Sequence, residues 1–243
     1  ATLLVSGGLA AVFAIARFVA QDPSFPSRVK GAVGHPLTYG GQAMILAAVA
    51  AAIAIRVRGR WRAGALLLLA VLLPALAGTF TRSAWIGFVA AAAVIVGFTR
   101  ARWLAALAVV IALLVAILPG VYQDRALSIL DPRSPWNVER VHMWEAGVRM
   151  FHDRPWTGVG LQDLHSIYER YKSPGALEPA GHLHSVYVHV AATMGVLGLI
   201  ALLALVAGLW RAAWKGFRAN PDGLGAALQL GVTAALVGFL VSG

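Results

Sequence analysis

Long apolar runs separated by short polar stretches dominate the chain. Seven runs are long enough, or nearly long enough, for a membrane-spanning helix, which needs roughly 20 mostly apolar residues. They cover residues 1–20, 37–55, 64–80, 83–98, 104–118, 183–210 and 224–242. The alternation of apolar and polar residues that marks a transmembrane β-strand is absent. The pattern therefore predicts an all-α fold, a polytopic bundle of transmembrane helices.

Two of these runs, 64–80 and 83–98, are short for full spans, and only a few residues separate them. We interpret the pair as a hairpin whose tip, near residues 79–83, lies at or slightly below the membrane interface. Pro74 is a candidate kink in the first arm, since neighbouring helices can accommodate a proline in a membrane.

The polar segment 119–182 is too long for a simple connector, and loops of this length are usually functional or disordered. Its turn-rich start makes Asn137 a plausible N-cap for a helix of about four turns, which Pro155 ends. The apolar stripe of this helix is Val141, Trp144, Val148 and Phe151. A second helix is predicted over 161–172, and its stripe is Leu161, Leu164, Tyr168 and Tyr171. We expect an ordered loop with amphipathic helices, possessing either a catalytic role or a purely structural one on the membrane surface.

The organisation that follows has three parts. Transmembrane helices fill 1–118, the large loop fills 119–182, and C-terminal transmembrane helices fill 183–243. The chain begins and ends inside apolar runs, without an initiator Met or a signal-peptide pattern. We therefore expect it to be an internal portion of a longer protein, with further spans before and after it.

Composition and charge support a membrane protein. Of the 243 residues, 59% are hydrophobic and 12% are charged, about half of the charged fraction in soluble domains. The net charge of +10 comes largely from three loops, whereas nine of the ten acids lie in the alternate segments. The basic residues are Arg56, Arg58, Arg60 and Arg62, then Arg100 and Arg102, then Arg211, Lys215 and Arg218. Positive loops favour the cytoplasm, so this distribution argues against nucleic-acid binding and predicts that 21–36, Arg82 and 119–182 face outward.

Arg82 occupies the predicted hairpin tip between two apolar runs. An arginine in such a place usually faces a polar cavity or a partner. If Ser83 caps the following helix, Arg82 and the helix N-terminus together form a natural anion site. The alternative, equally consistent with the position, is an arginine that snorkels to the interface and anchors the hairpin.

Arg140 lies three residues after the candidate N-cap Asn137, where its charge opposes the helix dipole. A bound anion would remove this conflict. A solvated arginine paired with Glu139 or Glu145 is the simpler alternative, and the position alone favours it.

Two histidines, His182 and His184, stand where the long loop enters the next apolar run. A histidine can act as a base near neutral pH. The pair could instead ligate zinc, but a third ligand at convincing spacing is missing and the chain has no cysteine. We therefore predict no metal site. His189, deeper in the same run, is interpreted as a structural hydrogen-bonding residue.

Four pieces of sequence are arranged around the outward loop. They are Thr81-Arg82-Ser83-Ala84, Arg140-Val141-His142-Met143-Trp144, Arg154-Pro155-Trp156-Thr157-Gly158-Val159-Gly160, and His184-Ser185-Val186-Tyr187 with Gly195-Val196-Leu197-Gly198. In this order they resemble the superfamily of O-antigen ligases and O-antigen polymerases, which are bacterial envelope enzymes. The resemblance runs from His35-Pro36 to the span after His184. The chain departs from the family pattern at Ser185 and Thr193, where the family often has Asn and an acid.

The resemblance implies a membrane glycosyltransferase that faces the periplasm from the bacterial inner membrane and needs no cofactor. Its donor would be a glycan linked to undecaprenyl diphosphate. A ligase moves the glycan to the lipid A core and a polymerase moves it to another repeat unit, and we prefer the ligase. Arg82 and Arg140 fall on the family arginines that hold the diphosphate. His184 falls on the histidine that takes the acceptor proton, in a displacement that inverts the anomeric configuration, and the candidate supporting residues are His182, Tyr187 and His35.

Two other function classes fit the sequence less well. A transporter of a lipid-linked glycan would use the same arginines, but it needs charged or broken helices near the bilayer midplane. Arg17 and His189 are the polar candidates there, and both fit near the outward interface. A non-catalytic scaffold would leave the ordered loop unexplained.

Overall fold

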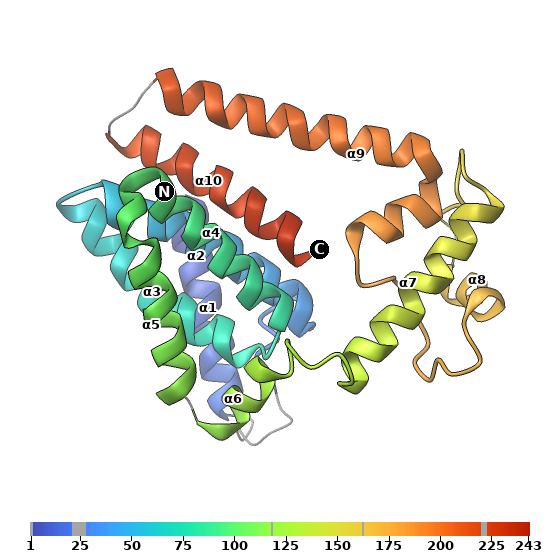
Figure 1. Cartoon of the computed structure of the whole chain (residues 1–243). Helices are drawn as coiled ribbons and strands as arrows, with labels where there is room; N and C mark the ends of the chain where they lie inside the picture. Colours follow the sequence, from blue (N-terminus) through green and yellow to red (C-terminus); the bar gives the residue numbers. More distant parts are fainter. Residues whose placement is uncertain (1, 21–27, 118, 162, 220–222) are drawn as a thin grey trace. The chain divides into compact units, whose positions relative to one another are not determined.

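The computed structural model describes residues 2–20, 28–117, 119–161, 163–219 and 223–243, and within these ranges the regular structure is helical, without β-strands (Figure 1). The helices are α1 Thr2–Ala20, α2 Pro36–Arg56, α3 Arg60–Gly78, α4 Arg82–Arg100, α5 Leu104–Ile117, α6 Gly120–Leu127, α7 Pro135–Asp153, α8 Leu164–Tyr171, α9 Val186–Ala219 and α10 Gly223–Ser242. A short 3-10 helix, Ala101–Trp103, joins α4 to α5. The predicted all-α fold is confirmed for the described residues.

Five stretches of the described chain are long and apolar enough to cross a membrane, which makes this a multi-pass membrane protein. They are Pro36–Arg56, Arg60–Gly78, Arg82–Ile117, Val186–Gly216 and Gly223–Ser242. The first predicted span is a shorter apolar helix, Val5–Ala20. The run 104–118 is not a full-length span of its own: α5 has 14 residues, roughly 21 Å of helix against roughly 30 Å of hydrocarbon core.

The hairpin arms are longer than the sequence suggested. α3 and α4 have 19 residues each, roughly 28 Å of helix, because α3 already begins at Arg60 and α4 continues to Arg100. α3 continues through Pro74. The arms are therefore not short, and the prediction that they are is wrong.

The chain forms two compact units, which are described separately. Unit 1 contains Ala1–Ala126 and Trp210–Ser242. Here α10 packs against α2 and α4 through small residues, a common arrangement between membrane helices. A Cβ atom at Gly87 would lie 2.7 Å from the carbonyl oxygen of Gly238, so α4 and α10 are in backbone contact. This close packing fixes the helix that begins with Arg82.

Unit 2 contains Leu127–Leu209 and Gly243. Its buried cluster joins α7, α8 and the start of α9 through Met143, Met150, Leu164, Tyr168, Leu183 and Ala192. The predicted helix between Asn137 and Pro155 and the predicted helix 161–172 correspond to α7 and to the shorter α8, whose N-cap is Asp163.

The N-cap of α7 is Ser134, not Asn137, so that part of the prediction is wrong. Pro135 follows Ser134, and the fixed φ angle of proline suits the first helical position. The Asn137 side chain instead donates hydrogen bonds to the carbonyl oxygens of Ser128 (3.1 Å) and Asp131 (2.7 Å), which ties the preceding turn to the helix.

α9 is two helical pieces joined at Gly195, whose φ of +64° and ψ of −158° break the helix. The piece before the kink is short, and the piece after it, 196–219, is long enough to span a membrane alone. The predicted span 183–210 is therefore interrupted shortly before its middle.

Candidate functional site

The hairpin tip that carries Arg82 has an unusual backbone. Phe80 adopts a left-handed conformation with φ of +49°, although its bulky side chain disfavours it. The Phe80 side chain is buried. Thr81 is the N-cap of α4, and Ser83, which the sequence suggested for that role, lies in the first turn of the helix. The tip therefore turns tightly, and Arg82 becomes the first residue of α4.

Arg28, from the segment before α2, holds one side of the tip. Its Nε donates to the carbonyl oxygen of Thr79 at 2.6 Å, and its Nη2 donates to Oγ1 of Thr81 at 3.0 Å. The neighbouring Val29 donates its backbone N–H to Gly78 O at 2.9 Å. Burial lowers the pKa of Arg28 from its ordinary value. The sequence alone does not identify Arg28, because nothing local connects it to Thr79, 51 residues away.

Helix α6 holds the other side of the tip. Arg125 donates from Nε to the carbonyl oxygen of Phe80 at 3.2 Å. The Tyr122 ring stacks on Phe80 with 4.6 Å between ring centroids and 23° between ring planes. Trp85 also contacts both rings and donates from Nε1 to Leu76 O at 3.0 Å. The strained tip is thus fixed from two sides.

Arg82 itself is buried, with 6% of its surface exposed. No side chain caps the first turn of α4, because the Thr81 hydroxyl points toward the carbonyl oxygens of Pro36 and Thr79, each at 3.3 Å. The guanidinium groups of Arg28 and Arg125 contact residues 79–81, directly before Arg82. Asp124 is the single acid among the described residues of unit 1. The tip therefore combines a helix N-terminus with a concentration of positive charge, and both favour an anion.

In unit 2, Arg140 lies in the second turn of α7, so the predicted conflict with the helix dipole is smaller than expected. Its side chain is half-buried, and burial lowers its pKa. Within the described residues the Arg140 guanidinium forms neither a hydrogen bond nor an ion pair. A desolvated cation without a protein partner is costly, and a bound anion would offset the cost.

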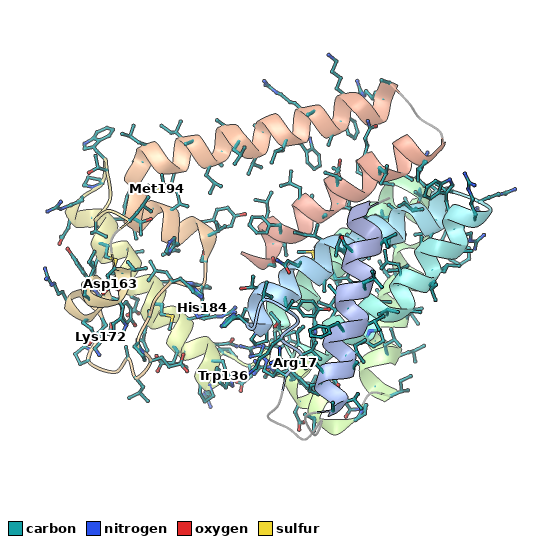
Figure 2. All side chains as sticks on the ribbon, turned by 180° about the vertical axis from the view of Figure 1, so that it is seen from behind. Arg17, Trp136, Asp163, Lys172, His184 and Met194 are labelled. Carbon is teal, nitrogen blue, oxygen red and sulfur yellow. The ribbon has the colours of Figure 1, made fainter. Side chains whose placement is uncertain are left out.

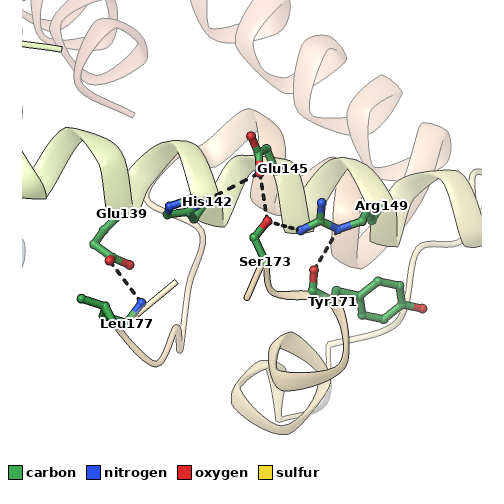
Figure 3. A network of polar contacts seen from close by, with 7 residues as sticks. All are labelled: Glu139, His142, Glu145, Arg149, Tyr171, Ser173 and Leu177. Atoms are coloured by element: carbon green, nitrogen blue, oxygen red, sulfur yellow. Dashed lines mark hydrogen bonds and ion pairs between the residues drawn. The ribbon is translucent and has the colours of Figure 1, made fainter. Parts of the chain in front are cut away.

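The two acids that could have paired with Arg140 have other roles (Figure 3). Glu139 accepts the backbone N–H groups of Leu177 and Glu178 at 3.1 and 3.2 Å. Glu145 accepts from the Ser173 hydroxyl at 3.0 Å and lies 3.8 Å from His142 Nδ1. These contacts fasten segment 171–178 to α7, so the predicted alternative of a Glu139 or Glu145 ion pair with Arg140 is not observed.

The face of α7 that carries Arg140 is apolar and exposed. Val141, Trp144 and Val148 of the predicted stripe are between 38% and 50% exposed, whereas Met143, Ala146, Gly147 and Met150 form the buried face. Trp136 and Trp144 lie four residues before and after Arg140, which places them on its side of the helix. Arg140 therefore lies between two tryptophan residues on one side of α7.

His182 and His184 lie together just before α9, and Figure 2 labels His184. Their ring centroids are 4.0 Å apart, and the backbone N–H of His184 donates to Nδ1 of His182 at 3.3 Å. His184 has a left-handed φ of +47° and is partly exposed, and Leu183 between the two histidines is buried. Tyr187 lies in the first turn of α9 and is 39% exposed.

The segment 155–160 forms backbone hydrogen bonds with both sides of the kink in α9. Val159 and Gly160 donate their N–H groups to the carbonyl oxygens of Ala192 (2.9 Å) and Thr193 (3.0 Å), and Val196 donates to Pro155 O at 2.8 Å. These bonds satisfy the backbone groups that the break at Gly195 releases. Two of the resembling sequence pieces thus have a structural role and support the helix that starts just after His184.

The candidate residues divide between the units. Unit 1 holds Arg82 and His35, and His35 is exposed at the N-cap of α2. Unit 2 holds Arg140 together with the cluster of His182, His184 and Tyr187. Arg28 and Arg125 also contact the tip, and the sequence alone does not predict either contact.

A family model described as O-antigen ligase matches residues 67–203, which is more than half of the chain. The matched range contains Arg82, Arg140 and His184, and it excludes Arg28 and His35. A comparison with curated proteins finds no match.

Proposed function

Because this chain belongs to the O-antigen ligase family, we propose that it transfers a glycan from undecaprenyl diphosphate to a hydroxyl of the lipid A core. Membership makes it an enzyme of the glycosyltransferase type and implies lipid-linked glycan substrates. Donor, acceptor and mechanism are the proposal, as is an active site that faces the periplasm.

The main support for the proposed site is the location of two residues with strained backbone conformations. Among the described residues, the non-glycine residues with positive φ are Phe80 and His184. Such conformations cost roughly 1–3 kcal/mol each and cluster at active sites, where the surrounding structure maintains them. Phe80 is two residues from Arg82, and His184 is itself the candidate base.

In the proposed mechanism, Arg82 and Arg140 bind the donor diphosphate. A guanidinium can bind phosphate oxygens through two parallel hydrogen bonds, and its charge stabilises the additional negative charge that develops as the diphosphate leaves. The desolvated Arg140 without a protein counter-ion and the buried Arg82 at an uncapped helix N-terminus both support this role.

His184 then acts as the general base. Its imidazole takes the proton of the acceptor hydroxyl while the hydroxyl oxygen forms a bond to the anomeric carbon. The bond from that carbon to the diphosphate oxygen breaks, and its electron pair leaves with undecaprenyl diphosphate, so the anomeric configuration inverts. His182 is the poorer base, because its Nδ1 lone pair already accepts the N–H of His184.

The test is a transfer assay with the purified full-length protein and an undecaprenyl-diphosphate oligosaccharide. Lipid A core and a second lipid-linked repeat unit are offered as separate acceptors, with EDTA present, and His184→Ala is measured in parallel. We expect transfer to lipid A core that EDTA spares and that His184→Ala reduces by at least about 100-fold, as for loss of a general base.

Three other outcomes would change the proposal. Transfer to the second repeat unit would identify a polymerase of the same family. Inhibition by EDTA would contradict a metal-independent mechanism. A donor that binds but is not transferred to either acceptor would favour a transporter of a lipid-linked glycan.

A further inference from the structure

We infer that Arg28 is a positioning residue for glycan transfer, because its guanidinium fixes the hairpin tip that presents Arg82. The inference rests on the proposed function and extends it to a residue outside the matched range 67–203. Arg28 would act through Arg82, without reacting itself.

The geometry of the contact supports this role. Arg28 uses two different nitrogens, one on a backbone carbonyl and one on a side-chain oxygen, at 2.6 and 3.0 Å. Its acceptors, Thr79 and Thr81, flank the strained residue Phe80. Both threonines are buried, with at most 2% of their surface exposed. A fork of two hydrogen bonds across three residues sets the direction of the turn, which a single contact could not do.

The tip depends on such a contact because its backbone is held in a conformation that Phe80 disfavours. A threonine at the N-cap commonly accepts a hydrogen bond from the first turn of its own helix. Thr81 does not, since its Oγ1 atom faces Arg28 and the carbonyl oxygens of Pro36 and Thr79. The hydroxyl is thus used to fix the tip, and the first turn of α4 is left without a side-chain cap beside Arg82.

Lysine could not replace this arrangement. An ammonium group is a point charge without the planar fork of a guanidinium, so it would keep the charge of Arg28 but lose the two-point contact. The expected loss therefore concerns geometry at Arg82. A displacement of about 1 Å at a substrate-positioning group can reduce a rate by about 100-fold.

The experiment compares Arg28→Lys with Lys30→Gln, a matched control. Lys30 is two residues away, is exposed, and its side chain forms no hydrogen bond or ion pair among the described residues. We expect Arg28→Lys to reduce kcat/KM by about tenfold, because lysine keeps the charge and one contact and Arg82 is then displaced by less than the roughly 1 Å that costs about 100-fold. Lys30→Gln should stay within about twofold. Thr81→Val removes the hydroxyl that accepts from Arg28 and that lies 3.3 Å from the carbonyl oxygens of Pro36 and Thr79, while the Arg28 contact with Thr79 O remains. It should give a smaller loss and serves if Arg28→Lys does not fold.

A double variant separates positioning from general stabilisation. If Arg28 acts through Arg82, adding Arg28→Lys to Arg82→Lys should reduce transfer by no more than about twofold further, because coupled residues are not additive. A further loss as large as in the wild-type background would overturn the inference. Full activity of Arg28→Lys would also overturn it.

Amide exchange gives a readout that does not need activity. The N–H groups of Phe80 and Thr81 should exchange faster in Arg28→Lys than in Lys30→Gln. Unchanged exchange would overturn the positioning. A different outcome is that the wild-type protein transfers no glycan while these N–H groups still exchange faster in Arg28→Lys. That outcome would refute the proposed function but not the structural contact.

Discussion

At the scale of single residues, two arginines on α7 have opposite surroundings. Arg140 has no hydrogen-bond or ion-pair partner within the described residues. Arg149 donates to Tyr171 O at 2.8 Å and to Ser173 Oγ at 2.9 Å (Figure 3). The two side chains therefore allow a comparison between an arginine proposed to bind the donor and an arginine that connects two segments of the fold.

We predict that Arg140→Gln reduces kcat/KM for the lipid-linked donor by about 100-fold, because a charged diphosphate contact is lost, while the unfolding midpoint is unchanged or rises. Arg149→Gln should keep the transfer activity and lower the unfolding midpoint, since segment 171–178 loses its two hydrogen bonds to the Arg149 side chain. Transfer kinetics and thermal unfolding of both variants check this. A lower midpoint in Arg140→Gln, or undiminished transfer, would contradict the ligand role.

The sequence identifies some of these residues and hides others. Arg82 and His184 are visible because each is a polar residue at the edge of an apolar run. Arg28 and Arg125 look like ordinary loop cations, since the atoms that they contact lie 45 to 53 residues away. The helix caps were assigned to Ser83 and Asn137 instead of Thr81 and Ser134, because several potential capping residues stand close together.

At the scale of elements, the kink in α9 determines how the short helix after His184 is supported. Gly195 has a positive φ, and a Cβ atom there would lie 2.5 Å from the carbonyl carbon of Trp156. Gly158, on the facing segment, also has a positive φ and meets the backbone of Thr193. Two glycines thus allow two backbones to touch, and the four hydrogen bonds between them depend on that approach.

We predict that Gly195→Ala lowers the unfolding midpoint, because the new methyl group collides with Trp156 and because the φ and ψ angles of Gly195 lie in a region that is open essentially only to glycine. Gly208→Ala is the matched control: it lies on the same helix with no atom within 4 Å of its Cβ position. Alanine favours a helix there, so that variant should be as stable as the wild type. Thermal unfolding in detergent compares them, and equal midpoints would show that the kink tolerates a side chain.

The sequence predicts the helices well because apolar runs of this length permit little else in a membrane. It does not predict the kink, since a glycine in an apolar run resembles any other membrane-helix glycine. Only the partner segment 155–160, which is more than thirty residues away, supplies the hydrogen bonds that make the break stable.

At the scale of the whole molecule, the residues proposed for the reaction belong to both units. Unit 1 supplies the arginine tip and unit 2 supplies Arg140 and the histidine pair. A membrane enzyme of this kind must present both sets of residues on the same side of the bilayer. The membrane topology is therefore the property on which the whole proposal depends.

The chain has no cysteine, so single cysteines report its topology without a background. We predict that Ala32→Cys and Leu177→Cys react with a membrane-impermeant maleimide from the periplasmic side, whereas Ala63→Cys and Ala101→Cys, beside the basic loops, react only after the membrane is opened. All four positions are exposed. Ala101 is the sharpest test, because the 14-residue α5 must carry the chain across between it and Leu177. Labelling of Ala101→Cys from outside would mean that α5 does not cross, and the charge-based topology would then be wrong.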